Sequence, residues 1–268
     1  MSYRNLSTRE SRLLSSLAAA GLSTFTLAQA REALGPDADA AARVLHRLTA
    51  KGWLARLQRG SYRLIPLEAG PEARWAPHEY AVASALVTPY YLAYATALHY
   101  YGYSEQQPGQ VWIATTRRKR PLTVEGVRYR FVTLGEKFFG HVSEPLLDGY
   151  IQVAEREKAI ADGFDHPEYC GGVIEPAKGL WFGSDEIDLD KTIAYSRRLG
   201  NRSAMRRMGF WLELLGGADE AALKLLETRG NRTYARLDPT GPPGGPKSAR
   251  WRLIINVPER QLLEWRKH

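Results

Sequence analysis

The sequence predicts an α+β fold, with a small N-terminal domain followed by a larger mixed α+β domain that has a small sheet and a helical C-terminal part. Apolar residues recur at three- and four-residue steps near both ends of the chain, which indicates helices, and β-prone runs lie in the middle. Residues 66–77 hold three prolines and a glycine, which interrupt both patterns. The expected domains are therefore residues 1–66 and 78–268, joined by a linker over residues 67–77.

Positive charge is concentrated in the first domain. The formal net charge is +8, and residues 1–66, with 10 Lys and Arg against 4 Asp and Glu, carry +6 of it. Neutralisation of phosphates with release of counterions is the main sequence-independent source of affinity for nucleic acids. The charge distribution therefore predicts a polyanionic partner for the N-terminal domain, whereas residues 67–268 are nearly balanced, as in an enzyme or a protein-binding domain.

Cysteine content and hydropathy limit the cellular setting. The single cysteine, Cys170, cannot form an intrachain disulfide. No run approaches the ~20 apolar residues that span a bilayer, and the N-terminus, MSYRNLSTRES, lacks the apolar core of a signal peptide. We therefore expect a cytoplasmic protein that has no membrane partner.

Three short helices are predicted before residue 53. Ser7 and Glu10 have the spacing of a capping box, and a second helix begins in the same way at Thr26. The third helix begins at Asp37 or Asp39, whose carboxylates suit an N-cap, and ends at a glycine. It has an apolar face, Ala41, Val44, Leu45 and Leu48, and a basic face, Arg43, Arg47 and Lys51.

A β-hairpin is predicted to follow the third helix. Its strands are residues 53–57 and 61–65, joined by Gln58-Arg59-Gly60, with Arg59 at the tip between Arg56 and Arg63. Three helices and a basic hairpin in this order are typical of a winged helix-turn-helix, in which the third helix enters a major groove and the hairpin rests on the backbone. The alternative is an ordinary solvated face, since surface helices normally carry charge on one side.

The larger domain is predicted to mix helices with short strands. A basic run, Arg117-Arg118-Lys119-Arg120, separates the first two strands; it is either a solvated loop or a set of secondary phosphate contacts. The expected strands are residues 111–115, 127–133, 151–153 and 250–257. The expected helices are residues 78–87, 92–101, 155–164, 187–199, 203–215, 218–228 and 259–267.

No catalytic, metal or cofactor site is predicted. The residues closest to a metal-binding cluster, Asp162, Asp165, His166 and Cys170, match no zinc spacing. Phosphate-cradling loops, dinucleotide fingerprints and the G-x-S-x-G elbow are absent from the sequence. A nuclease built on Asp148, Glu155, Glu157 and Lys158 is the remaining enzyme hypothesis. It is disfavoured because the acids and the lysine follow the spacing of helix-surface ion pairs.

Several stretches of the chain, in this order, resemble the AbiEi family of antitoxins of type IV toxin–antitoxin systems, which are also transcriptional repressors. The similarity runs from residue 7 into the 190s and includes residues 82–115, VASALVTPYYLAYATALHYYGYSEQQPGQVWIAT. Its most specific part is residues 156–172, REKAIADGFDHPEYCGG, and it continues more loosely through YARLDPTGPPGG.

The resemblance implies that the N-terminal domain binds an inverted-repeat operator in double-stranded DNA and represses its own operon. It also implies that the C-terminal domain counteracts a nucleotidyltransferase-like toxin, with or without direct contact. A metal-dependent nuclease and a plain transcriptional regulator, each targeted by the winged helix, are the alternatives. The predicted DNA contacts are Arg43, His46, Arg47, Thr49, Lys51, Arg56, Arg59 and Arg63, with His46 and Thr49 as candidates for base edges.

Overall fold

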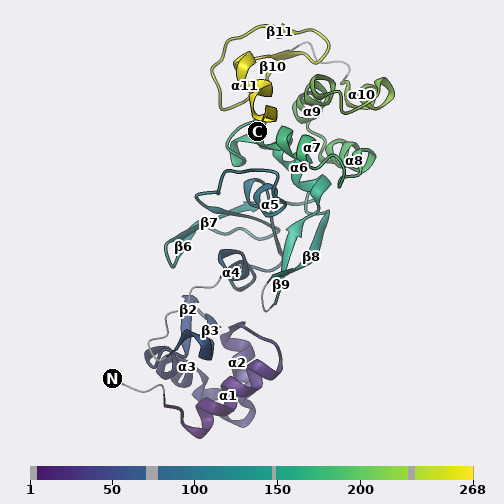
Figure 1. Ribbon diagram of the computed structural model, residues 1–268. Helices are drawn as coiled ribbons and strands as arrows, with labels where there is room; N and C mark the ends of the chain where they lie inside the picture. Colours follow the sequence, from purple (N-terminus) through teal and green to yellow (C-terminus); the bar gives the residue numbers. More distant parts are fainter. Residues whose placement is uncertain (1–4, 71–77, 147–148, 229–232, 268) are drawn as a thin grey trace. The chain divides into compact units, whose positions relative to one another are not determined.

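The computed structural model describes residues 5–70, 78–146, 149–228 and 233–267. The fold is α+β, as the sequence predicts, with eleven α-helices and three sheets in these residues (Figure 1). The chain divides into two units, each formed from segments distant in the sequence. Unit 1 comprises Met1–Tyr90, Leu122–Arg128 and Ser143–Gln152, and unit 2 comprises Tyr91–Pro121, Tyr129–Val142 and Val153–His268.

The first two helices of unit 1 begin at capping boxes. α1, Thr8–Ala19, follows Ser7, whose hydroxyl accepts from the Glu10 N–H while Glu10 Oε2 accepts from the Ser7 N–H at 2.8 Å. α2, Leu27–Leu34, begins in the same way at Thr26. Each box satisfies two backbone donors that a helix end leaves without partners. Both predicted helix starts are confirmed.

The third helix, α3, spans Ala41–Ala50 and is reached through a short 3-10 segment, η1, Gly35–Ala40. The predicted aspartate cap is wrong, because the Asp37 carboxylate lies 2.8 Å from Nη2 of Arg9 and α3 begins without a side-chain cap. The predicted apolar face is confirmed. Its four residues, Ala41, Val44, Leu45 and Leu48, pack in a buried core with Leu13, Leu17, Phe25, Ala30 and Leu34.

Unit 1 also contains a three-stranded antiparallel sheet in the order β1-β3-β2, formed by β1, Thr24–Thr26, β3, Ser61–Leu64, and β2, Leu54–Gln58. The hairpin is tighter than predicted, because Gln58 belongs to β2 and only two residues, Arg59 and Gly60, form the turn. Gly60 has φ +79°, a conformation that costs little only without a side chain.

A further helix of unit 1, α4, Glu79–Leu86, follows the sheet in the chain. Of the expected linker over residues 67–77, residues 71–77 lie outside the described residues, and Leu67–Ala69 form a 3-10 turn, η2. The C-terminal end of α4 contacts the hairpin, since Gln58 Nε2 donates to the carbonyls of Ala85 at 2.9 Å and Leu86 at 3.1 Å.

The largest sheet has six strands in the order β6-β7-β5-β4-β9-β8. The strands predicted over residues 111–115 and 127–133 are confirmed with those bounds as β5 and β7, which pair in parallel with Trp112 opposite Arg130. Residues 151–153 lie within β9, whereas β4, β6 and β8 are not predicted by the sequence. The bounds are β4 Tyr90–Leu92, β5 Val111–Thr115, β6 Leu122–Val124, β7 Val127–Thr133, β8 His141–Leu146 and β9 Gly149–Ala154.

The rest of unit 2 is mainly helical (Figure 1). A small three-stranded sheet, β10-β12-β11, lies near its end, where the predicted strand over residues 250–257 is reduced to two residues. The helices are α5 Ala95–Tyr100, α6 Arg156–Asp165, α7 Ile174–Phe182, α8 Leu189–Leu199, α9 Arg202–Leu215, α10 Glu220–Leu226 and α11 Glu259–Leu263. The small strands are β10 Ala235–Arg236, β11 Lys247–Ser248 and β12 Leu253–Ile254, and Glu264–Lys267 form a 3-10 turn, η4.

α6 lies at the centre of this helical region, and α7 packs against it through two glycines. A Cβ on Gly163 would lie 2.7 Å from Cβ of Pro176, and one on Gly179 would lie 2.9 Å from Cγ1 of Ile160. Both distances are shorter than side-chain packing allows, so the close approach of α6 and α7 requires glycine at both positions. The sequence does not predict α7, because its proline and glycine resemble helix breakers.

Candidate nucleic-acid interface

The exposed face of α3 is the centre of the candidate interface. Its outward residues are either small or basic, and α3 contains no acidic residue. The surrounding sequence continues this pattern, since residues 41–67 include six Lys and Arg and no Asp or Glu. The exposed positions of α3 are Ala42, Arg43, His46, Arg47 and Ala50.

Three of the predicted contact residues, Arg43, His46 and Thr49, differ in how freely they can bind a ligand. Arg43 and His46 are exposed and form no hydrogen bond or ion pair with the described residues. Thr49 is half-buried, and its hydroxyl donates to the Leu45 carbonyl at 2.9 Å. Arg43 and His46 therefore keep all their donors for a partner, whereas Thr49 can only accept.

Arg47 and Lys51 are held by a carboxylate that the sequence does not assign to the interface. Arg47 Nε lies 3.1 Å from Glu10 Oε1, and Lys51 Nζ lies 2.8 Å from Glu10 Oε2. The Glu10 side chain is fully buried, while 48% of the Arg47 side chain and 30% of the Lys51 side chain are exposed. Glu10 therefore fixes α3 against α1, and Arg47 faces solvent with its terminal guanidinium nitrogens while Nε binds inward.

The pKa of Glu10 reflects this arrangement. Burial alone would raise it, but hydrogen bonds from Lys51, from Ser7 and from Arg47 favour the charged form and lower the pKa to about 2. Glu10 is thus ionised at neutral pH and offsets one of the two positive charges that it holds. The net charge of this group of three residues is +1.

The turn of the hairpin does not project freely. The Gly60 carbonyl accepts from the Leu27 N–H at 2.9 Å, which fixes the turn to the start of α2, and Gln58 fixes it to α4. Arg56 and Arg59 are exposed, and Arg56 Nε donates to the Gln58 carbonyl at 3.4 Å. These two arginines remain available at the surface to bind a partner, on a short hairpin whose turn is held by hydrogen bonds to α2 and α4.

Arg63 is the one predicted contact that the structure removes from the surface. Only 2% of it is exposed, and its Nη2 lies 2.9 Å from Oε1 of Glu125, a residue of the same unit. Alternate residues of a strand point to opposite faces, and in β3 the buried residues are Ser61 and Arg63. The expectation that Arg63 lies on the outer face of the hairpin is therefore wrong.

The basic run in unit 2 forms a loop between β5 and β6. Arg117, Arg118 and Arg120 are exposed. Lys119 Nζ lies 5.3 Å from the ring centre of Phe131, and burial lowers the pKa of Lys119. Three arginines of the run are thus placed to meet an anion, and Lys119 packs against the sheet.

The four residues that the sequence places closest to a metal-binding spacing, Asp162, Asp165, His166 and Cys170, are engaged in other contacts or buried. Asp162 pairs with Lys158, whose Nζ is also 3.2 Å from the Tyr91 hydroxyl. Asp165 binds Lys137 at 2.8 Å and Asn201 at 2.6 Å. Cys170 is buried, and His166 lies 2.9 Å from Glu168. No group of three His, Cys, Asp or Glu residues within the described part of the chain is arranged to hold a metal ion.

The four residues of the nuclease hypothesis are not brought to one site. Asp148 lies outside the described residues. Glu155 and Glu157 share Lys191, at 3.0 Å and 3.3 Å, so one of their two negative charges is already offset. Lys158 is fully buried, with its ammonium at Asp162. The nuclease hypothesis needs the Lys158 ammonium beside the two glutamates to orient an attacking water, but this ammonium is bound to Asp162 and Tyr91 instead.

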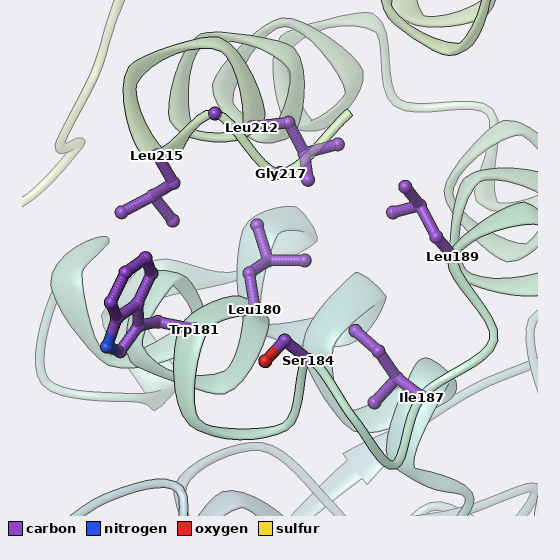
Figure 2. A pocket seen from close by; sticks show the side chains of 9 residues that line it. Leu180, Trp181, Ser184, Ile187, Leu189, Leu212, Leu215 and Gly217 are labelled. Carbon is purple, nitrogen blue, oxygen red and sulfur yellow. The ribbon is translucent and has the colours of Figure 1, made fainter. Parts of the chain in front are cut away.

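A separate cavity of about 270 Å³ lies in the helical part of unit 2 (Figure 2). Leu180, Leu212 and Leu215 gather on one side of it, with Ile187 and Leu189 across from them. Ser184 contributes the one hydroxyl among the nine described residues of its lining, and no ionisable side chain belongs to that lining. This cavity suits apolar contacts rather than acid–base chemistry.

The segment that contains most of α1, the acid-free face of α3 and the hairpin matches a known protein family. Residues 12–65, which run from α1 to the end of the hairpin, match the family described as "Transcriptional regulator, AbiEi antitoxin". The resemblance to the AbiEi family that is seen in the sequence is therefore confirmed over this segment. The match does not extend to residues 82–115 or to residues 156–172, the second of which is the part that the sequence predicts to be most specific.

The comparison with solved structures covers nearly the whole chain. The crystal structure of the RV2827C protein from Mycobacterium tuberculosis matches with a TM-score of 0.66 and 19% sequence identity, over 99% of this chain and 97% of that one. At this identity the likeness shows the fold alone. A search of curated proteins gives no match. No helix in the described ranges is both long and apolar enough to span a bilayer.

Proposed function

We propose that unit 1 contains a winged helix-turn-helix that binds double-stranded DNA through α3, and that the protein represses transcription of its own operon. The acid-free, exposed face of α3, within the segment that matches the regulator family, is the observation that carries this proposal. A ten-residue helix is ~15 Å long and ~10 Å wide, dimensions that suit a major groove ~12 Å wide.

The exposed side chains fall into two groups in this proposal. Arg43 and His46, which have no partner among the described residues, would read base edges, together with the outer nitrogens of Arg47. Arg56 and Arg59 would bind phosphates beside the groove. Lys51 holds α3 in place through its ion pair with Glu10. An inverted-repeat operator contains two half-sites, and each would bind the α3 of one copy of the chain.

We further propose that unit 2 supplies an antitoxin function of type IV against a nucleotidyltransferase-like toxin, without catalysis by this chain. The family of residues 12–65 and the sequence resemblance of residues 82–115 and 156–172 support it. A plain transcriptional regulator is the second candidate, because the family match ends at residue 65.

Binding to a duplex from directly upstream of the coding sequence tests the first proposal. Arg43→Ala should weaken binding by about 5- to 150-fold, the equivalent of ~1–3 kcal/mol for one base contact. Arg12→Ala is the matched control, because Arg12 is an exposed arginine on α1. Equal affinities of wild type and Arg43→Ala, with unchanged salt dependence, would contradict the assignment of α3 to the groove.

Co-expression with the adjacent toxin gene tests the second proposal. If unit 1 represses and unit 2 neutralises, Arg43→Ala should lose repression of a promoter fusion while still restoring growth. Failure of the wild-type chain to restore growth, with repression intact, would favour the plain regulator.

A further inference from the structure

A second cavity in unit 2, of about 220 Å³, lies where residues 104–112 meet residues 168–171. These two segments belong to the sequence blocks 82–115 and 156–172, to which the regulator domain gives no role. Unlike the apolar cavity of Figure 2, this one is lined by two aromatic rings together with three carboxamides and one carboxylate among the described residues. The residues that matter most are Gln106, Gln107, Gln110, Trp112, Glu168 and Tyr169.

The aromatic side of the cavity is rigid. The Trp112 and Tyr169 rings stack with centres 4.4 Å apart, and His166 stacks on Tyr169 at 5.0 Å. Tyr94 meets Tyr169 edge-on at 5.0 Å. Because this cluster is held on several sides, a planar ligand could bind next to it without ordering mobile side chains, which lowers the entropic cost of binding.

The polar side has hydrogen-bonding groups left for a ligand. The carboxamides of Gln106 and Gln107 form no hydrogen bond with the described residues. Gln110 Oε1 accepts from Arg130 Nε at 3.1 Å, which leaves its NH₂ group to donate. Glu168 has one oxygen at His166, which leaves the other to accept. Planar rings with donors and acceptors along their edges, such as nucleobases, are ligands that groups of this kind recognise.

The positive charge lies beside this cavity rather than in its lining. None of the described residues that line it is Lys or Arg. Trp112 lies on β5, which ends at Thr115, and the basic loop Arg117–Arg120 begins five residues after Trp112, at most ~17 Å further along the chain. The cation next to the lining is Arg130, whose Nε donates to Gln110 and whose guanidinium carbon lies 5.9 Å from the ring centre of Trp112. A strand longer than one nucleotide would bring neighbouring phosphates to the loop as well.

We propose that this cavity binds a base of a single-stranded nucleic acid whose flanking phosphates bind the loop Arg117–Arg120. Single-strand binding commonly combines aromatic and polar groups for the bases with a basic track for the backbone. The site is separate from α3, and it gives the sequence blocks 82–115 and 156–172 a binding role.

Fluorescence anisotropy of the full-length protein with labelled decamers tests the proposal. The probes are oligoadenylate and oligouridylate as RNA, oligodeoxyadenylate and oligothymidylate as DNA, and an abasic DNA decamer of equal charge. At least one of the four base-containing decamers should bind about 5- to 150-fold more tightly than the abasic strand, the range found for contacts to one base. Comparison of the RNA decamers with the DNA decamers shows whether the site binds single-stranded RNA or single-stranded DNA.

Two variants locate the site. The double substitution Gln106→Ala/Gln107→Ala should remove the advantage over the abasic strand, and Gln261→Ala, at an exposed glutamine of α11, is the matched control. Arg117→Ala/Arg118→Ala should weaken binding of base-containing and abasic strands alike and reduce the salt dependence. Melting temperatures of all variants show whether the fold is retained.

Three results of these binding measurements would overturn the proposal, and the Arg43→Ala variant provides a fourth test. The first is equal binding of abasic and base-containing strands. The second is an unchanged preference in the folded glutamine variant. The third is adenosine or uridine monophosphate binding as tightly as the decamers, which would leave the loop without a role. The Arg43→Ala variant should bind single strands as tightly as wild type does. If it loses single-strand binding, that binding belongs to α3 and not to the cavity. Failure of this proposal can therefore be distinguished from failure of the proposed duplex binding.

Discussion

Replacing Glu10 by Gln isolates the charge that joins α1 to α3. Glutamine keeps the capping box, because its side-chain oxygen can still accept from the Ser7 N–H, as Gln29 does for Thr26. The variant therefore removes the carboxylate's charge but keeps its shape. Arg47 and Lys51 lose their common counter-charge, and the buried amide offers them weaker hydrogen bonds.

The size of the effect follows from the pKa. A fall from the ordinary 4.5 to about 2 corresponds to ~3 kcal/mol of preference for the charged form in the folded state. Both cations are partly exposed to solvent, which screens the interaction, so we expect a loss of ~1–2 kcal/mol in the free energy of unfolding at pH 7.

The pH dependence gives a second signature. Because the pKa of Glu10 is lower in the folded than in the unfolded protein, its stabilisation is complete above pH 4.5 and is lost as the pH falls towards 2. Urea unfolding followed by circular dichroism at several pH values should show wild type and Glu10→Gln converging in this window. Glu32→Gln, at an exposed glutamate of α2, is the control. Equal stability of wild type and Glu10→Gln at pH 7, with parallel pH profiles, would refute the reasoning.

Three further predictions concern charge and packing. Glu10→Gln should also strengthen duplex binding and steepen its salt dependence, because one negative charge leaves the interface; weaker binding by folded protein would argue against this. Arg63→Met should lower the free energy of unfolding by ~1–3 kcal/mol but leave the duplex affinity of folded protein unchanged, as titration under native conditions can show. Gly163→Ala should cost ~1–3 kcal/mol by forcing α6 from Pro176, and an unaltered melting temperature would exclude that clash.

The sequence predicts the regular elements well where local signals agree with the final packing. The capping boxes at Ser7 and Thr26 and the apolar stripe of α3 are local features, and all three are found. β5 and β7 likewise have the predicted bounds. α7 is missed, because its glycine and proline weaken a helix locally and become favourable only against α6.

The candidate interface is predicted only in part for a similar reason. Arg43, His46, Arg56 and Arg59 are exposed as expected, since helix periodicity and a tight turn determine their direction. Arg63 faces inward, because the register of β3 against its neighbours decides which of its alternating residues is buried.

The sequence by itself determined the three helices and the hairpin of the N-terminal module, its excess of positive charge and the acid-free helix face, because these depend on composition and on the spacing of neighbouring residues. The tertiary structure decided which cations are free and which are held. Glu10 meets Arg47 and Lys51 across 37 and 41 residues of chain. Trp112 and Tyr169 likewise meet only in the fold. Contacts between residues so far apart arise from the packing of whole elements, which no local pattern encodes.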